Sequence, residues 1–272
     1  MHFADAYCLS RYRHLYLQMT MKISVIIPAY NEASIIGETL SALMKADRPS
    51  NPIEFIVVNN ASTDRTAEIA SSFPDIRVVT ESEKGLTKAR QCGNAHAQGD
   101  ILIYIDADTR IPKHLLRTIE EKFIADPKLV AMSGPYKYHD WTWYGRLILW
   151  LYHWTLVPMN QLVINRILNK GSVFYGGNFA VRKKALDKIG GFDTGLEFWS
   201  EDTQIGRRMS QEGRVRFFHR AYVYTSARRY YAEGFLRVLM RYIMNYFWDI
   251  IFHRPFTKGY QDVRSTPPKQ TT

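Results

Sequence analysis

The feature that most constrains this chain is a series of short, continuously apolar segments, each followed by a helical pattern. Lys22–Tyr30, Ile53–Asn60 and Ile101–Ile105 are rich in β-branched residues and carry few polar positions. A strand that is apolar on successive residues must be covered on both faces, as in a parallel sheet. The helices expected after the strands cover residues 32–45, 65–73, 86–98 and 112–126, with a further strand over 76–80. This order predicts an α/β fold with a doubly wound, mostly parallel sheet and a Rossmann-like nucleotide-binding half.

Ligands of such sheets bind beyond the carboxyl ends of the strands, so the residues directly after each strand are the candidate site. Pro28–Glu32 follows the first strand, and Asn59–Asp64 follows the second. Asp106-Ala107-Asp108 follows the strand that ends at Ile105. We therefore expect these three segments to meet at one edge of the sheet.

The strongest local signal is the carboxylate pair Asp106 and Asp108. Two carboxylates at i and i+2 after a strand can share a hard divalent cation such as Mg²⁺ or Mn²⁺, which prefers oxygen ligands. Alternatively, one can hold the cation and the other a ribose hydroxyl. An isolated Asp-x-Asp is weak evidence, because the same residues also occur in solvated loops that cap a following helix.

The second half of the chain is less regular. Leu147–Asn165 contains no Asp, Glu, Lys or Arg, but Pro158 and two amides interrupt it. Tyr175–Val181 is expected to form a loop and a strand. Glu201-Asp202 is expected to open a helix that runs to Glu212. Two short strands are expected over residues 214–218 and 222–225.

A strongly apolar helix with one polar stripe is expected over Glu233–His253. Its polar residues recur every fourth position and therefore stay near one face of the helix. Arginines within a membrane span are costly, so a helix that lies in the membrane interface is the better interpretation. The alternative is that this helix and Leu147–Asn165 pack together as an apolar subdomain or a dimer interface.

The charge of the chain indicates which binding partners to expect, and its cysteine content indicates the cellular compartment. The net charge is +10, and residues 228–272 carry eight Lys or Arg against three Asp or Glu. A basic end suits phosphates and acidic lipid head groups. The aromatic residues of this region lie on the apolar side of the expected helix, which favours lipid over nucleic acid. Only Cys8 and Cys92 occur, which excludes a disulfide framework and indicates a reducing compartment.

The expected organisation has four parts. Residues 1–20 form an N-terminal extension that does not have the pattern of a secretory signal peptide, and Met21 stands directly before the first strand as a possible natural start. Residues 21–230 form the α/β domain. Residues 231–264 form a membrane-associating amphipathic helix, and residues 265–272 form a polar, flexible tail.

Several motifs occur together and in order, and this set resembles family 2 glycosyltransferases of the GT-A fold. The motifs are Pro28–Glu32, Asn59–Asp64, Gly85–Gly99, Asp106–Asp108, Gly176–Phe179 and Glu201-Asp202. The resemblance covers residues 21 to about 229. It implies an inverting transfer of a sugar from a UDP- or GDP-sugar to a lipid-linked or glycan acceptor, at the cytoplasmic face of a membrane.

The resemblance also implies roles for individual residues. The donor nucleotide would contact residues of the strand-end segments and of the helix after Gly85, namely Pro28, Ala29, Tyr30, Glu32, Asn60, Arg90, Asp106 and Asp108. Asp106 and Asp108 would hold Mn²⁺ or Mg²⁺, which stabilises the leaving diphosphate. Asp202 would be the general base, with Glu201 positioning the acceptor. Gly176, Gly177 and Asn178 would line the acceptor side.

The sequence departs from the family pattern in three places. Asn60 stands where the family has an acidic residue facing the base, which leaves the identity of the base open. Ser226 occupies the expected place of a histidine ligand, and His219 lies too early to replace it. Residues 226–230 lack the Gln and Trp of the motif found in processive members. Arg228 and Arg229 remain candidates for diphosphate or lipid phosphate contacts.

Two other functional classes remain open. A nucleotidyltransferase would also use paired carboxylates and a metal, but it needs a Gly-rich, basic loop after the first strand, and Pro28–Ser34 is neither. A catalytically inactive protein that binds a sugar or nucleotide is the second alternative, because both residues of the pair Asn59 and Asn60 are amides.

Overall fold

The computed structural model describes residues 21–163, 174–196, 199–257, 259 and 263. The expected extension at 1–20 and the expected tail at 265–272 lie outside these residues. The central sheet has seven strands in the order β3-β2-β1-β4-β7-β5-β8. The strands of its first half are β1 (Ile23–Ala29), β2 (Ile53–Asn60), β3 (Ile76–Glu81) and β4 (Ile101–Ile105). They are mutually parallel where they pair, so the predicted doubly wound, mostly parallel arrangement is confirmed for this half.

The rest of the sheet is mixed. Its strands are β5 (Leu129–Ser133), β7 (Asn178–Arg182) and β8 (Arg214–Phe217), and a separate two-stranded sheet pairs β6 (Tyr136–Tyr138) with β9 (Val223–Thr225). Strand β7 runs antiparallel to both β4 and β5. Consequently, β7 begins at the edge where β4 ends, with Asn178 opposite Ile105.

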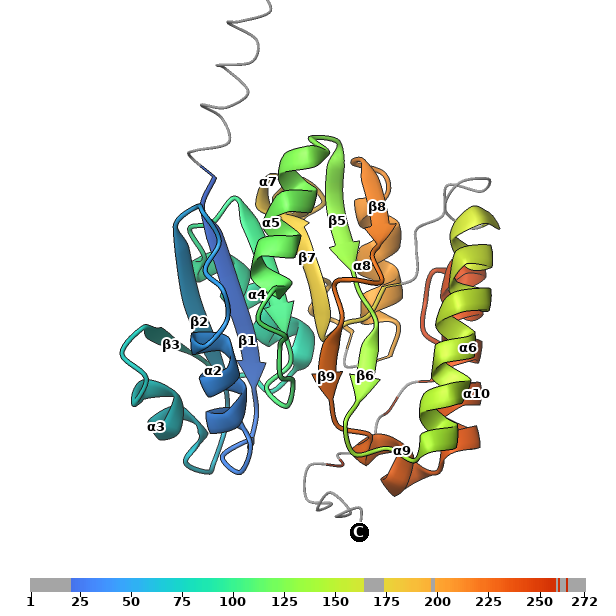
Figure 1. Cartoon of the computed structure of the whole chain (residues 1–272), viewed down its shortest axis with the longest axis horizontal. Coiled ribbons are helices and arrows are strands. Elements are labelled where there is room, and N and C mark those ends of the chain that lie inside the picture. The colour runs from blue at the N-terminus through green and yellow to red at the C-terminus, as the bar shows by residue number, and fades with distance from the viewer. Residues whose placement is uncertain (1–20, 164–173, 197–198, 258, 260–262, 264–272) are drawn as a thin grey trace, which may run out of the picture.

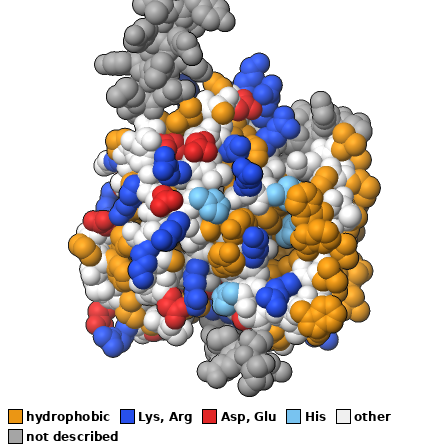
Figure 2. Space-filling model, viewed as in Figure 1, with side chains coloured by type: hydrophobic (Ala, Val, Ile, Leu, Met, Phe, Trp, Pro, Cys, Tyr) orange, Lys and Arg blue, Asp and Glu red, His pale blue; other side chains and the backbone are white. Residues whose placement is uncertain are grey.

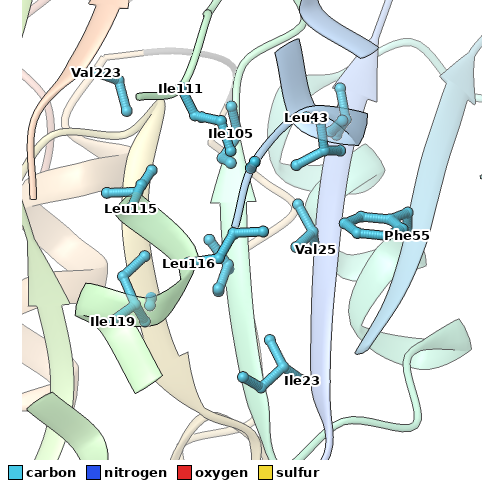
Figure 3. Close-up of a cluster of buried hydrophobic side chains, with 14 of the residues drawn as sticks. Ile23, Val25, Leu43, Phe55, Ile105, Ile111, Leu115, Leu116, Ile119 and Val223 are labelled. Carbon is cyan, nitrogen blue, oxygen red and sulfur yellow. The ribbon is translucent and has the colours of Figure 1, made fainter. Parts of the chain in front are cut away.

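Helices cover both faces of the sheet (Figure 1). They are α2 (Ile36–Met44), α3 (Thr66–Ser71), α4 (Leu86–His96), α5 (Leu115–Ala125), α6 (Trp143–Asn160), α7 (Lys183–Lys188), α8 (Glu201–Met209), α9 (Arg228–Glu233) and α10 (Phe235–Phe252). One apolar cluster joins β1 and β4 to α2 and α5, as Figure 3 shows for Ile23, Val25 and Leu116. A second cluster on the opposite face includes Ile26, Ile56 and residues of α4 and α8. Side chains on successive strand residues thus enter opposite clusters, as two-sided burial requires.

Several expected boundaries differ from the structure. The first helix begins at Ile36 and not at Glu32, because Asn31 adopts a left-handed conformation and residues 32–35 form a turn. The helix expected over Glu233–His253 is α10, which begins two residues later at Phe235, and the short helix α9 before it, which ends at Gly234 with a φ of +86°, was not expected. Strands β5 and β6 were not expected.

Helices α6 and α10 lie side by side at one edge of the molecule (Figure 1), and the Tyr246 hydroxyl on α10 donates a hydrogen bond to Asn160 Oδ1 at the end of α6. The middle of the polar stripe of α10 faces the protein, since Asn245 is 3% and Asp249 is 1% exposed, whereas Arg237 and His253 near its two ends are exposed. Apolar side chains such as Phe247 and Ile251 are exposed as well. Within the described part of the chain, no helix combines the length and apolar character that a membrane span requires.

Candidate active site

The predicted site segments come together at one edge of the sheet. The ends of β1, β2 and β4 place Pro28–Glu32, Asn60 and Asp106 there, and antiparallel β7 brings Gly176-Gly177 to the same edge. The Asp106 backbone N–H donates to the Gly177 carbonyl at 3.3 Å. The topology therefore explains why residues from both halves of the chain share one place.

The glycine pair fits closely between acidic side chains. A Cβ on Gly177 would lie 1.9 Å from Asp106 Oδ2 and 2.7 Å from the Tyr136 hydroxyl oxygen. A Cβ on Gly176 would lie 3.1 Å from Glu201 Oε1 and 3.5 Å from Asp202 Cβ. Asp202 and Asp106 therefore border the same dipeptide, as expected if the Asp-x-Asp segment and the Glu201-Asp202 pair belong to one site.

A buried arginine connects these carboxylates. Arg90 on α4 is 1% exposed, and its Nη2 donates to the Gly176 carbonyl at 2.7 Å. Its guanidinium also lies 3.8 Å from Asp106 Oδ1 and 3.5 Å from Glu201 Oε1. Arg90 is therefore almost fully buried against Asp106 and Glu201 and can hold these carboxylates in place, while its expected contact with the nucleotide stays a prediction.

Burial dominates the ionisation of this group. It raises the pKa of Asp106 to about 6, and the charges of Asp108 and Glu32 add to the rise while Arg90 opposes it. Burial also raises the pKa of Glu201 to about 8, with the charge of Asp202 acting in the same direction. Unfavourable carboxylate charge of this kind is typical of sites that bind a cation or handle a proton.

Asp202 lies in the first turn of α8, directly after a residue with unusual backbone geometry. Ser200 has φ +69° and ψ +3°, a left-handed conformation that is costly for a residue other than glycine. The Thr203 backbone N–H donates to Asp202 Oδ1 at 2.7 Å. Burial raises the pKa of Asp202, while hydrogen bonding to the Thr203 N–H and the charge of Arg90 oppose the rise. Such a carboxylate is a suitable proton acceptor.

Arg228 approaches the Asp-x-Asp pair from the C-terminal half. Its two terminal nitrogens donate to the two oxygens of Glu32 at 3.1 and 2.7 Å, and Nη2 lies 2.9 Å from Asp108 Oδ2. The chain before Arg228 is fixed by Asp140, which accepts hydrogen bonds from the Ser226 hydroxyl and the Ala227 N–H. Ser226, in the place of the family's histidine, thus anchors the start of α9.

The donor set at this edge fits a hard divalent cation whose remaining ligands come from a substrate. Among the described residues, no three or more His, Cys, Asp or Glu side chains form a ready-made metal cluster. Asp106 and Asp108 offer carboxylate oxygens beside Glu32, and their mutual repulsion contributes to the raised pKa of Asp106. A cation would relieve this repulsion, and phosphate oxygens are ligands that Mg²⁺ commonly retains.

Other predicted residues have structural roles as well. Asn60 is 3% exposed, and its amide donates to the Glu83 carbonyl while its Oδ1 accepts from the Gly85 N–H. Asn178 is 2% exposed and donates to the carbonyls of Gly134 and Ala221. These amides fix the loops around the site.

The residues of the segment after the first strand, Pro28–Glu32, differ in how far they are buried. Pro28 and Ala29 are buried at the end of β1. Tyr30 is half-buried, with Lys84 Nζ 4.0 Å from its ring centroid. Tyr30 is therefore the member of this segment whose ring reaches the site surface.

Sequence reasoning missed the tyrosines of the site. Tyr136 on β6 accepts a hydrogen bond from the Gly177 N–H at 2.6 Å, and the Tyr175 ring centroid lies 4.8 Å from that of Tyr136. No spacing rule connects these residues, since β6 itself was not expected. His219, predicted not to be a ligand, stacks on Trp154 with ring centroids 5.0 Å apart.

The fold and the strand-end carboxylates define the class of protein as a GT-A type α/β domain. The mannosyltransferase PcManGT from Pyrobaculum calidifontis, solved in complex with GDP-Man and Mn²⁺, superposes with a TM-score of 0.63 at 23% identity, over 91% of this chain and 72% of that chain. TarS from S. aureus, solved in complex with UDP-GlcNAc, gives a TM-score of 0.60 at 23% identity, over 76% of this chain and 58% of that chain.

The family itself follows from the sequence match. Residues 24–190, more than half of the chain, match the model of glycosyl transferase family 2, and the chain belongs to this family. A probable glycosyltransferase of Bacillus subtilis, YdaM, is 26% identical over 263 residues, which is 83% of this chain and 58% of that protein. A dolichol-phosphate mannosyltransferase of Pyrococcus furiosus is 34% identical over 178 residues, 62% of this chain and 48% of that protein. The chain thus spans about half the length of these relatives.

Proposed function

We propose that the protein is an inverting glycosyltransferase that moves a sugar from a UDP- or GDP-sugar to an acceptor hydroxyl. The observation that carries this proposal is the convergence of Asp106, Glu201 and Asp202 around Gly176-Gly177 and Arg90. The two nucleotides bound by the structurally similar proteins, GDP-Man and UDP-GlcNAc, support both donor bases as candidates.

Each residue has a task in this reaction. Asp202 accepts the proton of the acceptor hydroxyl as the oxygen attacks the anomeric carbon, on the face opposite the leaving group. Glu201, protonated at neutral pH by its raised pKa, can donate a hydrogen bond to the acceptor. Asp106 and Asp108 would hold Mn²⁺ or Mg²⁺, which when bound stabilises the negative charge that develops on the diphosphate. Arg228, paired with Asp108, is placed to contact the same phosphates.

A donor screen tests this proposal. The full chain is incubated with UDP- and GDP-sugars and Mn²⁺, and release of nucleoside diphosphate is measured without an added acceptor. We expect slow release with one donor and its loss in Asp108→Ala. Release of pyrophosphate instead would indicate a nucleotidyltransferase, and failure to bind any donor with Mn²⁺ in calorimetry would indicate the inactive alternative.

We also propose that α6 and α10 hold the protein on the cytoplasmic face of a membrane, as a peripheral protein. Figure 2 shows hydrophobic side chains gathered at the edge where α6 lies. The most exposed large apolar residues of this edge include Leu236 at 69%, Ile251 at 63%, Trp154 at 57% and Trp150 at 56%. The exposed charges next to them, Arg146 and Arg237, are positive, which suits the anionic lipids of a cytoplasmic leaflet.

Flotation with vesicles of phosphatidylglycerol and phosphatidylcholine tests the membrane proposal. We expect binding that increases with the anionic lipid, and that falls at least about tenfold in Trp150→Asp and Phe247→Asp, since each buries a charge in the interface. Ser71→Asp on the exposed end of α3 is the matched control. A stable dimer in solution without flotation would show that the apolar edge is an interface between two copies.

A further inference from the structure

Arg228, the cation next to the Asp-x-Asp pair, is carried by a helix and not by a strand end. Its guanidinium donates to both oxygens of Glu32 and lies 2.9 Å from Asp108 Oδ2, and 17% of its side chain remains exposed. An arginine side chain is long and flexible, so the reach of its head group depends on where its backbone is held. Because α9 begins at Arg228 itself, whatever fixes the first turn of α9 also places this cation.

The pairing of β6 with β9 brings a second loop to the start of α9. The two strands are parallel, so the chain leaves both of them in the same direction. The His139 backbone N–H continues the pairing beyond β6 by donating to the Thr225 carbonyl at 3.3 Å. As a result, Asp140 lies next to Ser226, although 86 residues separate the two in the chain.

Asp140 acts as the cap that α9 lacks in its own sequence. Ala227 precedes the helix, and its side chain has no oxygen that could accept a hydrogen bond from the first turn. The Asp140 carboxylate instead accepts from the Ala227 N–H at 2.7 Å and from the Ser226 hydroxyl at 2.5 Å. Ser226 Oγ in turn accepts from the Arg228 N–H at 3.2 Å. A continuous series of hydrogen bonds therefore runs from Asp140 to the backbone of Arg228.

Other contacts of the same loop hold α9 independently of this carboxylate. The Tyr231 hydroxyl on α9 donates to the backbone carbonyl of Asp140 at 2.7 Å. Trp141, which is 6% exposed, stacks on Tyr230 with ring centroids 4.7 Å apart. These contacts stay available when the Asp140 side chain is shortened. We therefore expect α9 to remain folded in such a variant, with its first turn held less firmly.

A firmly held backbone is important for an arginine that binds phosphate. Hydrogen bonds between a guanidinium and phosphate oxygens are strong when their geometry is fixed. A mobile arginine loses conformational entropy when it is ordered by a ligand, and this loss reduces the affinity. An arginine that is already in place avoids most of the loss. Asp140, which is 7% exposed, would thus influence ligand binding through Arg228.

We propose that Asp140 is a positioning residue of the donor site, which holds the start of α9 so that Arg228 meets the diphosphate of the nucleotide. This inference rests on the proposed glycosyl transfer and adds to it a residue that acts through another. Its consequence is specific. Removing the Asp140 carboxylate weakens nucleotide binding only when Arg228 is present.

Titration calorimetry of the full chain with GDP and with UDP, each with Mn²⁺, tests the inference. For the nucleotide that binds, Asp140→Ala should weaken the affinity at least about tenfold, as expected for poorly formed charge-assisted hydrogen bonds. Asp140→Asn keeps an acceptor for the Ala227 N–H and should recover most of the affinity. In the Arg228→Gln background, Asp140→Ala should cause no further loss.

Two results would contradict the inference in different ways. An equal loss of affinity from Asp140→Ala with and without Arg228 would overturn the positioning role and leave the proposed glycosyl transfer intact. Absence of binding of both nucleotides to the wild type would overturn the inference together with the proposed function.

Asp126 supplies the matched control. Its carboxylate also accepts from one backbone N–H, that of Lys128, and from one side chain, that of Arg214. It precedes β5, which begins at the sheet edge opposite the site. Asp126→Ala should lower the melting temperature, followed by circular dichroism, and leave nucleotide affinity unchanged. Equal weakening of nucleotide binding by Asp126→Ala and Asp140→Ala would indicate a general loss of structure and overturn the assignment of Asp140.

Discussion

The two halves of the sheet differ in how they deliver side chains to the site. In the first half, parallel strands β1, β2 and β4 end at one edge, and the residues that follow them are placed by the strands themselves. In the second half, Asp202 and Arg228 reach the same edge from helices, held by Ser200 and by the hydrogen bonds of Asp140. The first half thus provides the binding platform, and the second half provides groups whose position depends on long-range contacts.

If the first half binds the donor and the second half supplies the proton acceptor, removing the general base Asp202 should strongly lower turnover and leave donor binding unchanged. Asp202→Asn keeps the shape of the side chain and removes its ability to accept the proton, so kcat should fall about 10²- to 10⁴-fold. Titration calorimetry with the donor and Mn²⁺ should give a nearly unchanged Kd. Asp47→Asn, an exposed carboxylate, is the control. Loss of donor binding in Asp202→Asn would place this residue on the donor side.

Arg228 joins the two halves by its ion pairs with Glu32 and Asp108. Arg228→Gln leaves Glu32, which is 4% exposed, without its guanidinium partner, and removal of one member of a buried ion pair costs about 3–5 kcal/mol. Because Mn²⁺ would replace the lost positive charge, its addition should raise the melting temperature of the variant more than that of the wild type.

The exposed pair Arg65–Glu68 supplies the control for Arg228. Arg65→Gln should leave the melting temperature nearly unchanged, because exposed ion pairs contribute little to stability, and Mn²⁺ should affect it as it affects the wild type. Equal responses of Arg228→Gln and Arg65→Gln to Mn²⁺ would argue against a cation at Asp106 and Asp108.

The contact between the halves is tightest at Gly177. Gly177→Ala places a methyl group 1.9 Å from Asp106 Oδ2, so the carboxylate or the backbone of the loop must move, at a cost of about 1–3 kcal/mol. Metal-dependent donor affinity should weaken at least about tenfold in calorimetry. Gly37→Ala on α2, where the nearest atom is 3.7 Å away, should be neutral or slightly stabilising. A functional Gly177→Ala would show that Asp106 tolerates displacement.

Glu201 should affect stability in a pH-dependent way. Its pKa is about 8 in the folded chain against an ordinary value of 4.5, so between these values the folded state binds more protons than the unfolded state. The free energy of unfolding therefore falls as pH rises from 5 to 8. Glu201→Gln removes this titration, and its stability relative to the wild type should improve by roughly 1 kcal/mol or more over that range. Urea unfolding at both pH values measures the difference, and parallel profiles would contradict it.

The same contrast explains how much of the fold the sequence predicts. Strand β4 begins and ends where expected, and β1 and β2 lie within or match their predicted segments, because continuous apolar runs are a local signal. Strand β5 was missed, since Leu129–Ser133 is short and its partners on β7, such as Phe179 for Ser133 and Val181 for Ala131, lie far along the chain. The start of α10 was placed two residues too early, although Gly234 was a local clue to it.

The site residues that could be predicted are those whose type and position after a strand or at a helix start identify them. Asp106, Asp108, Glu201 and Asp202 were all placed at one site by motif. The structure brings Asp106, Glu201 and Asp202 together around Gly176-Gly177, and Arg228 pairs with both Asp108 and Glu32. The partner of Asp108 and Glu32 was not predictable, because Arg228 lies 196 residues from Glu32 in the chain. The burial of Arg90 was also inaccessible, since a helix charge gives no sign in the sequence of whether it faces solvent or the core.

The left-handed serine before α8 has a consequence for engineering. A glycine at position 200 would remove a conformational cost of about 1–2 kcal/mol, but it would also widen the range of directions in which the first turn of α8 can leave the preceding loop. Random libraries selected only for heat resistance should therefore enrich changes at Ser200, and those variants should hold Asp202 less rigidly. Substitutions at Ser200 would then raise thermal stability and lower turnover, although Ser200 takes no part in the reaction itself.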